Sequence, residues 1–208
     1  MWFITCLTAK LVSCVCSHRL CRMCLYTYNL HLHYLQCLVV PIHKRGDRSL
    51  VSNYRPVSLT SVVCKQMEHA IATYLRQVWG ANDWLYEGQH GFRPGYSCES
   101  QVITVCQDIA DTIDNGDRMD AIIVDFSKAF DLVPHGRLLV KIANSGVEVR
   151  VVEWIKQFLT GRTQRVRVGG VLSDEVRVSS GVPQGSVLGP LLFLAYVNDI
   201  GRNIESNI

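Results

Sequence analysis

The sequence lacks a long apolar run, and this absence bears first on membranes. No uninterrupted apolar stretch approaches the roughly 18 residues that a membrane-spanning helix requires. A secretory signal is not indicated either, because no basic residue precedes the first apolar run and Lys10 interrupts it. We therefore expect an intracellular protein without a membrane-spanning segment.

A large excess of charge and a disulfide framework are also missing. The net charge of the 208 residues is only +3, which by itself indicates little about nucleic acid. Six of the nine cysteines lie in the first 37 residues, and Cys64, Cys98 and Cys106 are scattered over the remainder. This distribution excludes a small secreted protein held together by disulfides, so we expect reduced thiols.

Residues 1–37 differ in character from all that follows, being apolar and rich in cysteine. Cys21 and Cys24 could pair with His31 and His33 in a zinc site. However, six residues separate the two pairs and one separates the histidines, whereas a zinc finger needs about a dozen and more than one. We favour a poorly packed leader, unrelated to the remainder, over a zinc module.

The first half of the remaining sequence predicts one strand and two helices. Residues 38–42 form a short apolar strand, followed by a basic turn at 43–48, and Pro56 holds Arg55 extended. Residues 61–79 and 97–114 carry apolar side chains at helical spacing. We expect those apolar faces to be core, and in the second helix the face comprises Val102, Val105, Cys106, Ile109 and Ile113.

The second half predicts three further helices and a hairpin. Residues 135–145 and 148–159 form helices that end at Gly146 and Gly161. Charged and apolar residues alternate strictly at 165–168, and a Gly-Gly pair follows. The same alternation returns at 175–178, which predicts a pair of antiparallel strands joined by a turn. An apolar helix follows around residues 191–197.

The stretch around Asp125 carries the strongest chemical signal. Residues 121–124 are apolar and rich in β-branched types, which predicts a buried strand with Asp125 at its carboxyl end. A carboxylate there needs a partner, and a divalent metal is one such partner. The alternative is an Asp that caps the following turn, and for an isolated Asp this alternative is preferred.

Four ordered blocks resemble the reverse transcriptases of non-LTR (LINE-type) retrotransposons. Asp125-Phe-Ser-Lys-Ala-Phe-Asp131 with Val133-Pro-His135 resembles motif A of that family. Asn-Tyr-Arg-Pro-Val-Ser-Leu at 53–59 and Gln-His-Gly-Phe-Arg-Pro at 89–94 resemble two fingers blocks, and residues 179–193 resemble motif B. The resemblance extends from Val39 to Ile208, nearly the whole chain.

The resemblance implies an α+β fold, the right hand of a polymerase. Residues 38–208 would be a partial reverse transcriptase domain, with fingers at 38–118 and a partial palm at 119–208. The family palm is an antiparallel sheet backed by helices, and the thumb is absent from this sequence. Residues 1–37 would remain outside the domain.

The resemblance also assigns roles at the nucleotide. Lys44 and Arg55 would contact the phosphates of an incoming nucleotide, since Arg grips two oxygens while Lys acts as a point charge. Phe126 would lie beside the nucleotide, and Phe130 would lie under its sugar and exclude a 2′-hydroxyl by bulk. Gln184 would contact the nucleotide and its template base, with Gly185 making room. Without the resemblance, the basic residues would be a solvated loop and Phe130 a core side chain.

Nucleic acid would lie against three arginines. By resemblance Arg93 lies on the template side, while Arg165 and Arg167 border the cleft, where phosphate contacts give salt-dependent affinity. The alternative for the strand arginines is a solvated face. The implied partners are an RNA template, a DNA primer and deoxynucleotide triphosphates, in a nuclear protein.

Two Mg²⁺ ions serve nucleotidyl transfer in the intact family. Asp125 and the backbone carbonyl of Phe126 would supply part of their coordination, and a pair of adjacent aspartates supplies the rest. No Asp-Asp pair occurs in this sequence. We therefore expect neither ion to be held stably and no polymerase activity from this chain alone. The alternative function is a non-catalytic relic of a transposable element that binds nucleic acid.

Overall fold

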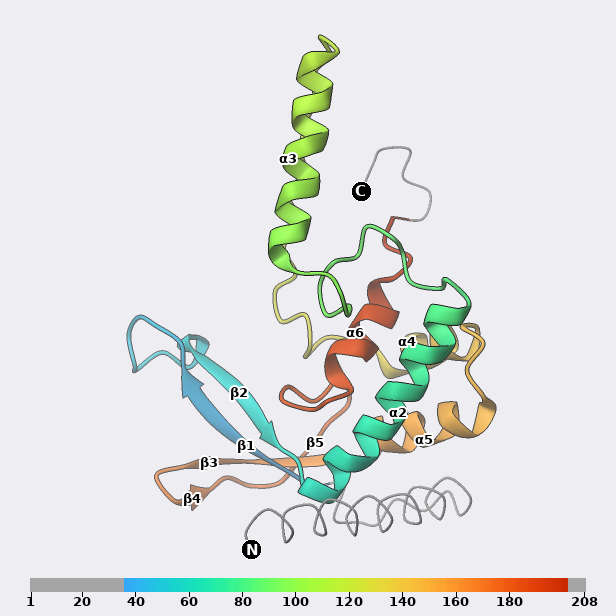
Figure 1. Ribbon diagram of the computed structural model, residues 1–208. Helices are drawn as coiled ribbons and strands as arrows, with labels where there is room; N and C mark the ends of the chain where they lie inside the picture. The colour runs from blue at the N-terminus through green and yellow to red at the C-terminus, as the bar shows by residue number, and fades with distance from the viewer. Residues whose placement is uncertain (1–35, 202–208) are drawn as a thin grey trace, which may run out of the picture.

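The computed structural model describes residues 36–201 (Figure 1), so the cysteines and histidines of the candidate zinc site lie outside the described residues. The fold is mixed α+β, as expected. Its elements in chain order are β1 (Gln36–His43), η2 (Val51–Asn53), β2 (Tyr54–Leu59), α2 (Val62–Ala81), α3 (Cys98–Asp114), α4 (His135–Ala143), α5 (Val149–Leu159), β3 (Thr163–Val168), β4 (Val171–Leu172), β5 (Val176–Arg177) and α6 (Gly189–Val197). No helix among residues 36–201 is long and apolar enough to cross a membrane.

The sheet is mixed, whereas an antiparallel sheet was predicted. β1 pairs antiparallel with β2 but parallel with β3, and β3 pairs antiparallel with β4 and β5. A parallel pair needs a long crossover connection, and here the chain between β1 and β3 carries α2 to α5. The crossover brings residue 37 next to residue 164. Cys37 is buried in β1, so the domain boundary predicted after residue 37 falls inside a strand.

The core lies between helices rather than within the sheet. Trp79 of α2, Trp154 and Phe158 of α5, and Leu192 of α6 are all fully buried in one cluster. The indole of Trp79 donates to the hydroxyl of Ser145 at 2.8 Å, which satisfies its N–H inside the core. This packing confirms the predicted core face of the helix at 61–79 and the predicted apolar helix around residues 191–197.

Local capping explains where the two long helices begin. The Ser61 hydroxyl accepts from the amide of Cys64 at the start of α2. At α3 the side chains and backbones of Ser97 and Ser100 form a reciprocal capping box. Both helices predicted at 61–79 and 97–114 are therefore confirmed in position.

The predicted burial of α3 is wrong. None of its residues is buried, and the helix projects away from the other elements in Figure 1. The side chains of Val102 and Ile113 are 60% and 67% exposed. Helical spacing identifies an apolar face but does not supply a surface for that face to pack against.

The predicted buried strand at residues 121–124 is also wrong. These residues have no regular structure, and Ile122 and Ile123 are 91% and 92% exposed. A strand forms when its N–H and C=O groups pair with a neighbour. Among residues 36–201 no strand pairs with this run. Asp125 is consequently exposed rather than carried on a buried rim.

The predicted hairpin is confirmed, but its returning chain forms two short strands instead of one. Gly169 and Gly170 both have positive φ at the turn, which only glycine adopts freely. The returning chain first pairs with Arg167 and Val168 through β4, and then with Thr163 and Gln164 through β5. Residues 173–175 break the return into these two short strands.

Candidate functional site

Two loops that are distant in sequence dock against each other through their backbones. One loop follows Asp125, and the other leads from β5 into α6. The amide of Gly181 donates to the carbonyl of Val133 at 2.8 Å, and the amide of Val182 donates to the carbonyl of Phe130 at 2.7 Å. The contact therefore joins the segment resembling motif A to the segment resembling motif B.

Gly181 is the residue that permits this approach. A side chain there would place Cβ 2.7 Å from the carbonyl oxygens of Phe130 and Asp131, and φ is +87°. Nε2 of His135, at the start of α4, donates to the Gly181 carbonyl at 2.8 Å. The donation requires a hydrogen on Nε2. The N–H of Gly181 is thus held by the loop after Asp125, and its C=O by the helix that follows that loop.

The loop before α6 also contacts the sheet. The amide of Ser58 in β2 donates to the carbonyl of Gln184 at 2.8 Å. At Gly185, φ is +95° and a Cβ would lie 3.2 Å from the Ser58 carbonyl and from Cγ1 of Val57. A side chain at Gly185 would therefore press against β2, while Gly185 itself remains exposed. Gln184 lies where β2 and both loops meet.

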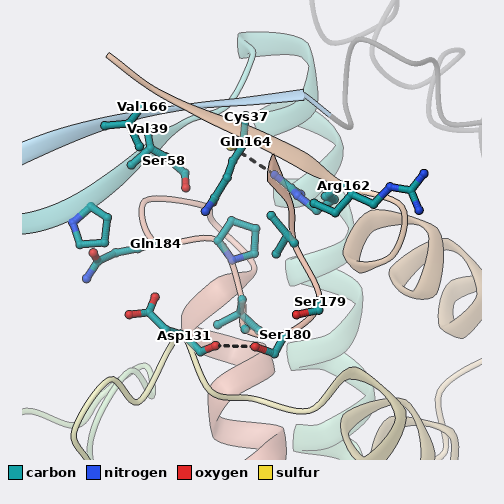
Figure 2. A pocket seen from close by; sticks show the side chains of 16 residues that line it. Cys37, Val39, Ser58, Asp131, Arg162, Gln164, Val166, Ser179, Ser180 and Gln184 are labelled. Carbon is teal, nitrogen blue, oxygen red and sulfur yellow. Dashed lines mark hydrogen bonds between the residues drawn. The ribbon is translucent and has the colours of Figure 1, made fainter. Parts of the chain in front are cut away.

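A cavity of about 380 Å³ lies beside this junction (Figure 2). Gln184 is the only sequence-predicted site residue that lines it, and Oε1 of Gln184 is buried without a hydrogen-bond partner in the described part of the chain. Asp131, Arg162 and Arg177 also line the cavity, and no sequence motif assigned them a role. The cavity is therefore lined by both acidic and basic side chains beside the Gln184 loop.

Arg162 is a buried cation on the wall of this cavity. Its guanidinium donates to the carbonyl of Phe158 at 3.0 Å and to the sulfur of Cys37 at 3.3 Å, a contact drawn in Figure 2. It also lies over the ring of Phe158. These contacts tie α5 to the first residues of β1. The arginine lies directly before β3, and its burial has no signal in the local sequence.

Phe126 and Phe130 belong to an aromatic cluster. The ring of Phe130 stacks on Phe193 of α6 at 5.1 Å between centroids, and meets Phe92 edge-on at 6.2 Å. Phe126 meets Phe193 edge-on at 6.3 Å and remains 47% exposed. The structure thus brings the two predicted aromatics together, and adds Phe92 and Phe193 from two of the three other blocks that carry the resemblance.

Lys44 and Arg55 lie on neighbouring segments. Arg55 in β2 pairs in register with Ile42 in β1, and the amide of Lys44 donates to the carbonyl of Asn53. Both Lys44 and Arg55 are exposed, and neither lines the cavity. The antiparallel β1–β2 pair holds the two backbones together while leaving the cationic side chains in solvent.

Arg93 has structural contacts within its own loop. Its guanidinium donates to the carbonyls of Tyr86 and Glu87 and lies 4.6 Å from the ring centre of Tyr96. Arg165 and Arg167, by contrast, are exposed on β3. They alternate with Gln164 and Val166, which line the cavity. The arginines of β3 therefore lie on the opposite face of the strand from the cavity.

A metal site is not assembled in the described part. Asp125 is exposed in an irregular segment, and residues 36–201 contain no cluster of three His, Cys, Asp or Glu side chains that could hold an ion. Divalent metals need several oxygen ligands in fixed positions. The residues present, Asp125 and the Phe126 carbonyl, do not fit that requirement.

Glu68, a buried carboxylate on α2, was not predicted from the sequence. It occupies the same helical stripe as Cys64 and Ile71, where an apolar residue is the default. Its Oε2 accepts from the amides of Val187 and Leu188, directly before α6. An acidic residue placed at a core position of an amphipathic helix was the signal in the sequence that could have identified it.

Comparison with known proteins identifies the family of this chain. Residues 42–208 match the family described as reverse transcriptase (RNA-dependent DNA polymerase), which generally uses divalent metal ions. The chain is 35% identical over 165 residues to "Probable RNA-directed DNA polymerase from transposon X-element" of Drosophila melanogaster. It is 32% identical over 163 residues to "RNA-directed DNA polymerase from mobile element jockey" of the same species.

Each of these two alignments covers 78% of this chain and 18% of the relative, so the chain spans about a fifth of the length of these proteins. The matched region includes β2, both docked loops and α6. The chain belongs to the reverse transcriptase (RNA-dependent DNA polymerase) family, as a reverse transcriptase domain of the kind found in retrotransposon polymerases.

Proposed function

We propose that this chain forms the fingers, at 38–118, and part of the palm, at 119–208, of an RNA-directed DNA polymerase that copies a transposon RNA. Its substrates would be deoxynucleotide triphosphates, added to a DNA primer along an RNA template. The reaction is nucleotidyl transfer, which in the intact family uses two Mg²⁺ ions. The protein would then work in the nucleus, at chromosomal DNA.

The observation that carries this proposal is the docking of three separate blocks around Gln184. The Val182 amide bonds to the carbonyl of Phe130, and the carbonyl of Gln184 bonds to the amide of Ser58. These contacts join β2, the loop after Asp125 and the loop before α6. A nucleotide held between fingers and palm needs such a junction, because its phosphates, sugar and base are contacted from different segments.

Each segment has a proposed task at the nucleotide. Lys44 and Arg55 bind the triphosphate, since both cations are exposed and lie on adjacent extended segments. Phe130 bears on the sugar and excludes a 2′-hydroxyl by bulk, and its stacking on Phe193 fixes its ring. Gln184 contacts the base pair through its side-chain amide, whose Oε1 lacks a protein partner among the described residues.

Arg165 and Arg167 are proposed to bind the phosphates of the template–primer duplex. They project from the same face of β3, two residues apart, and are exposed. Contacts between cations and phosphates release counterions, so the affinity falls as salt rises. Arg93 is proposed to act on the template side by holding the loop that contains Phe92 rather than by direct contact.

Metal binding by this chain alone is not part of the proposal. Asp125 is one carboxylate in an exposed segment, so we propose that two-metal catalysis requires further ligands that residues 36–201 do not provide. What this chain contributes is the positioning of the nucleotide and the duplex.

Fluorescence anisotropy with a labelled RNA template–DNA primer duplex tests the proposal. We expect the 208-residue chain to bind the duplex, with an affinity that falls steeply between about 50 and 200 mM salt. The double change Arg165→Ala/Arg167→Ala should remove two phosphate contacts. The slope of log affinity against log salt should therefore become shallower by about two. Arg150→Ala, an exposed arginine on α5 away from β3, is the matched control.

A second measurement separates polymerase from relic. Incorporation of labelled nucleotide in the presence of Mg²⁺ is measured for two proteins. One is the 208-residue chain, and the other is the protein encoded by the uninterrupted reading frame of the transcript that contains it. Incorporation by the longer product that is abolished by Asp125→Ala supports the polymerase. Duplex binding without incorporation by either protein would leave only the alternative, a non-catalytic nucleic-acid-binding relic. Failure to bind the duplex at low salt would reject both.

A further inference from the structure

Glu68 is the one carboxyl side chain in the described residues that is fully buried. It lies on the core stripe of α2 with Cys64, Ile71 and Leu75, and no ion pair of the described residues involves it. A carboxylate buried without hydrogen-bond donors is strongly unfavourable. Its presence at a core position therefore requires partners that donate to it.

Those partners are the backbone amides at the start of α6. Oε2 of Glu68 accepts from the amide of Val187 at 2.7 Å and from the amide of Leu188 at 3.1 Å. Helix starts leave several N–H groups without acceptors. Here the Gly189 amide is satisfied by the Ser186 hydroxyl, and Pro190 has no N–H. Glu68 therefore supplies the acceptor for the amides of Val187 and Leu188.

The same carboxylate is held from its own helix. Cys64, one turn earlier on α2, donates its thiol hydrogen to Oε1 of Glu68, with 3.5 Å between sulfur and oxygen. Both oxygens thus have a described donor, which fixes the side chain in one orientation. A negative charge at the amino end of α6 is also favoured by the helix dipole.

These contacts fix one end of the loop that carries Gln184. The other end is fixed at Gly181, whose amide bonds to the carbonyl of Val133. Gln184 lies between the two attachments, and its carbonyl reaches the amide of Ser58. Release of the attachment at Val187 would free the loop on the side that leads into α6.

We infer that Glu68 is a positioning residue, which holds the Gln184 loop through the amides of Val187 and Leu188 and so sets the affinity for the nucleotide. It does not touch the nucleotide itself. The inference rests on the proposed function of Gln184. A residue that acts only through Gln184 should have no effect on nucleotide binding once the Gln184 side chain is removed.

The test uses the 208-residue chain and a fluorescent methylanthraniloyl derivative of dATP. Glu68→Met keeps the buried volume but removes the acceptor, and we expect it to weaken binding about tenfold. Glu68→Gln keeps an oxygen that can accept both amide bonds, and we expect binding within about twofold of the parent chain. In the Gln184→Ala background, Glu68→Met should cause no further loss.

Amide exchange measured by NMR gives a readout at a distance. Glu68→Met should accelerate exchange of the Ser58 amide, which bonds to Gln184 and does not contact Glu68. The control is Glu99→Ala, which removes an exposed carboxylate from the first turn of α3. It should change neither Ser58 exchange nor nucleotide binding. Glu68→Leu replaces Glu68→Met if the latter does not fold.

Two results would overturn the inference. One is unchanged Ser58 exchange in Glu68→Met, and the other is an equal loss of dATP affinity with and without Gln184. If the parent chain binds neither dATP nor the duplex, the proposed function fails. The Ser58 exchange then still decides whether Glu68 holds the Gln184 loop, so the two failures are distinguishable.

Discussion

At the scale of single residues, the site depends on positions where a side chain is absent or unusual. Gly181 lets two backbones approach to distances that any Cβ would prevent. Glu68 places a carboxylate in the core because two amides require an acceptor. In both cases the residue type is dictated by backbone atoms of a segment far away in the sequence. Side-chain patterns along the local sequence do not report such atoms.

Gly181→Ala should destabilise the protein by about 3 kcal/mol, because a new Cβ would overlap two carbonyl oxygens that belong to backbone and cannot rotate away. The matched control is Gly170→Ala. Gly170 has nearly the same φ, +86° against +87°, but a Cβ added there would meet no atom within 4 Å. The control should therefore cost only about 1 kcal/mol of left-handed strain.

Urea denaturation of the two variants and the parent chain measures the difference. Equal destabilisation by Gly181→Ala and Gly170→Ala would show that backbone conformation alone, and not the contact between the two loops, accounts for the effect. A larger effect at Gly181 would support the docked arrangement of the segments around Phe130 and Gln184.

Cys64 is a buried thiol whose surroundings oppose its ionisation. Burial, and next the charge of the Glu68 carboxylate beside it, raise the pKa of Cys64 from an ordinary value of 9.0 to about 12. The unfolded chain would therefore lose this proton at lower pH than the folded chain does. The contribution of Cys64 to stability is complete below pH 9.0 and is lost as the pH rises towards 12.

Cys64→Ser should remove this pH dependence while keeping a hydroxyl that can donate to Glu68. Across the window from pH 9.0 to about 12, the free energy of unfolding of the parent chain should fall relative to the variant by up to ~1.4 kcal/mol per pH unit. Urea titrations at several pH values measure the difference. Cys106→Ser, which changes an exposed thiol on α3, is the control. A constant difference between parent and Cys64→Ser would contradict the prediction.

At the scale of elements, a helix and an extended segment form in different ways. α3 satisfies its own backbone hydrogen bonds and is capped by Ser97 and Ser100, so it forms without packing. Residues 121–124 have the composition of a strand but need a neighbouring strand to pair with, and they are irregular. The local sequence therefore predicted the helix at 97–114 correctly and the strand at 121–124 wrongly.

Val102→Lys and Ile113→Lys should leave the free energy of unfolding within about 0.5 kcal/mol of the parent, because both side chains are mainly exposed on α3. Leu75→Ala, at a fully buried position of α2, should by comparison cost about 2–5 kcal/mol. Thermal or urea unfolding measures all three. If Val102→Lys or Ile113→Lys lowered the free energy of unfolding as much as Leu75→Ala, α3 would be packed in solution.

At the scale of the whole molecule, the helices and the hairpin could be predicted because their signals are local. Ser61 and Ser97 mark helix starts, and Gly169 with Gly170 marks the turn. The parallel pairing of β1 with β3 could not be predicted, because it joins segments separated by four helices. The same holds for the cavity, whose walls come from β1, β2, β3 and β5, the loop at Asp131 and the loop before α6.

The sequence by itself determined the family, the α+β class and the residues that carry the motifs, because each motif is a contiguous run. Only the tertiary structure decided which of those runs meet. It brought Phe130 and Gln184 to one junction, left Asp125 exposed, and recruited Glu68 and Arg162 from outside every motif. The physical reason is that hydrogen bonds and burial depend on distances in space, which the order of residues along a chain does not specify.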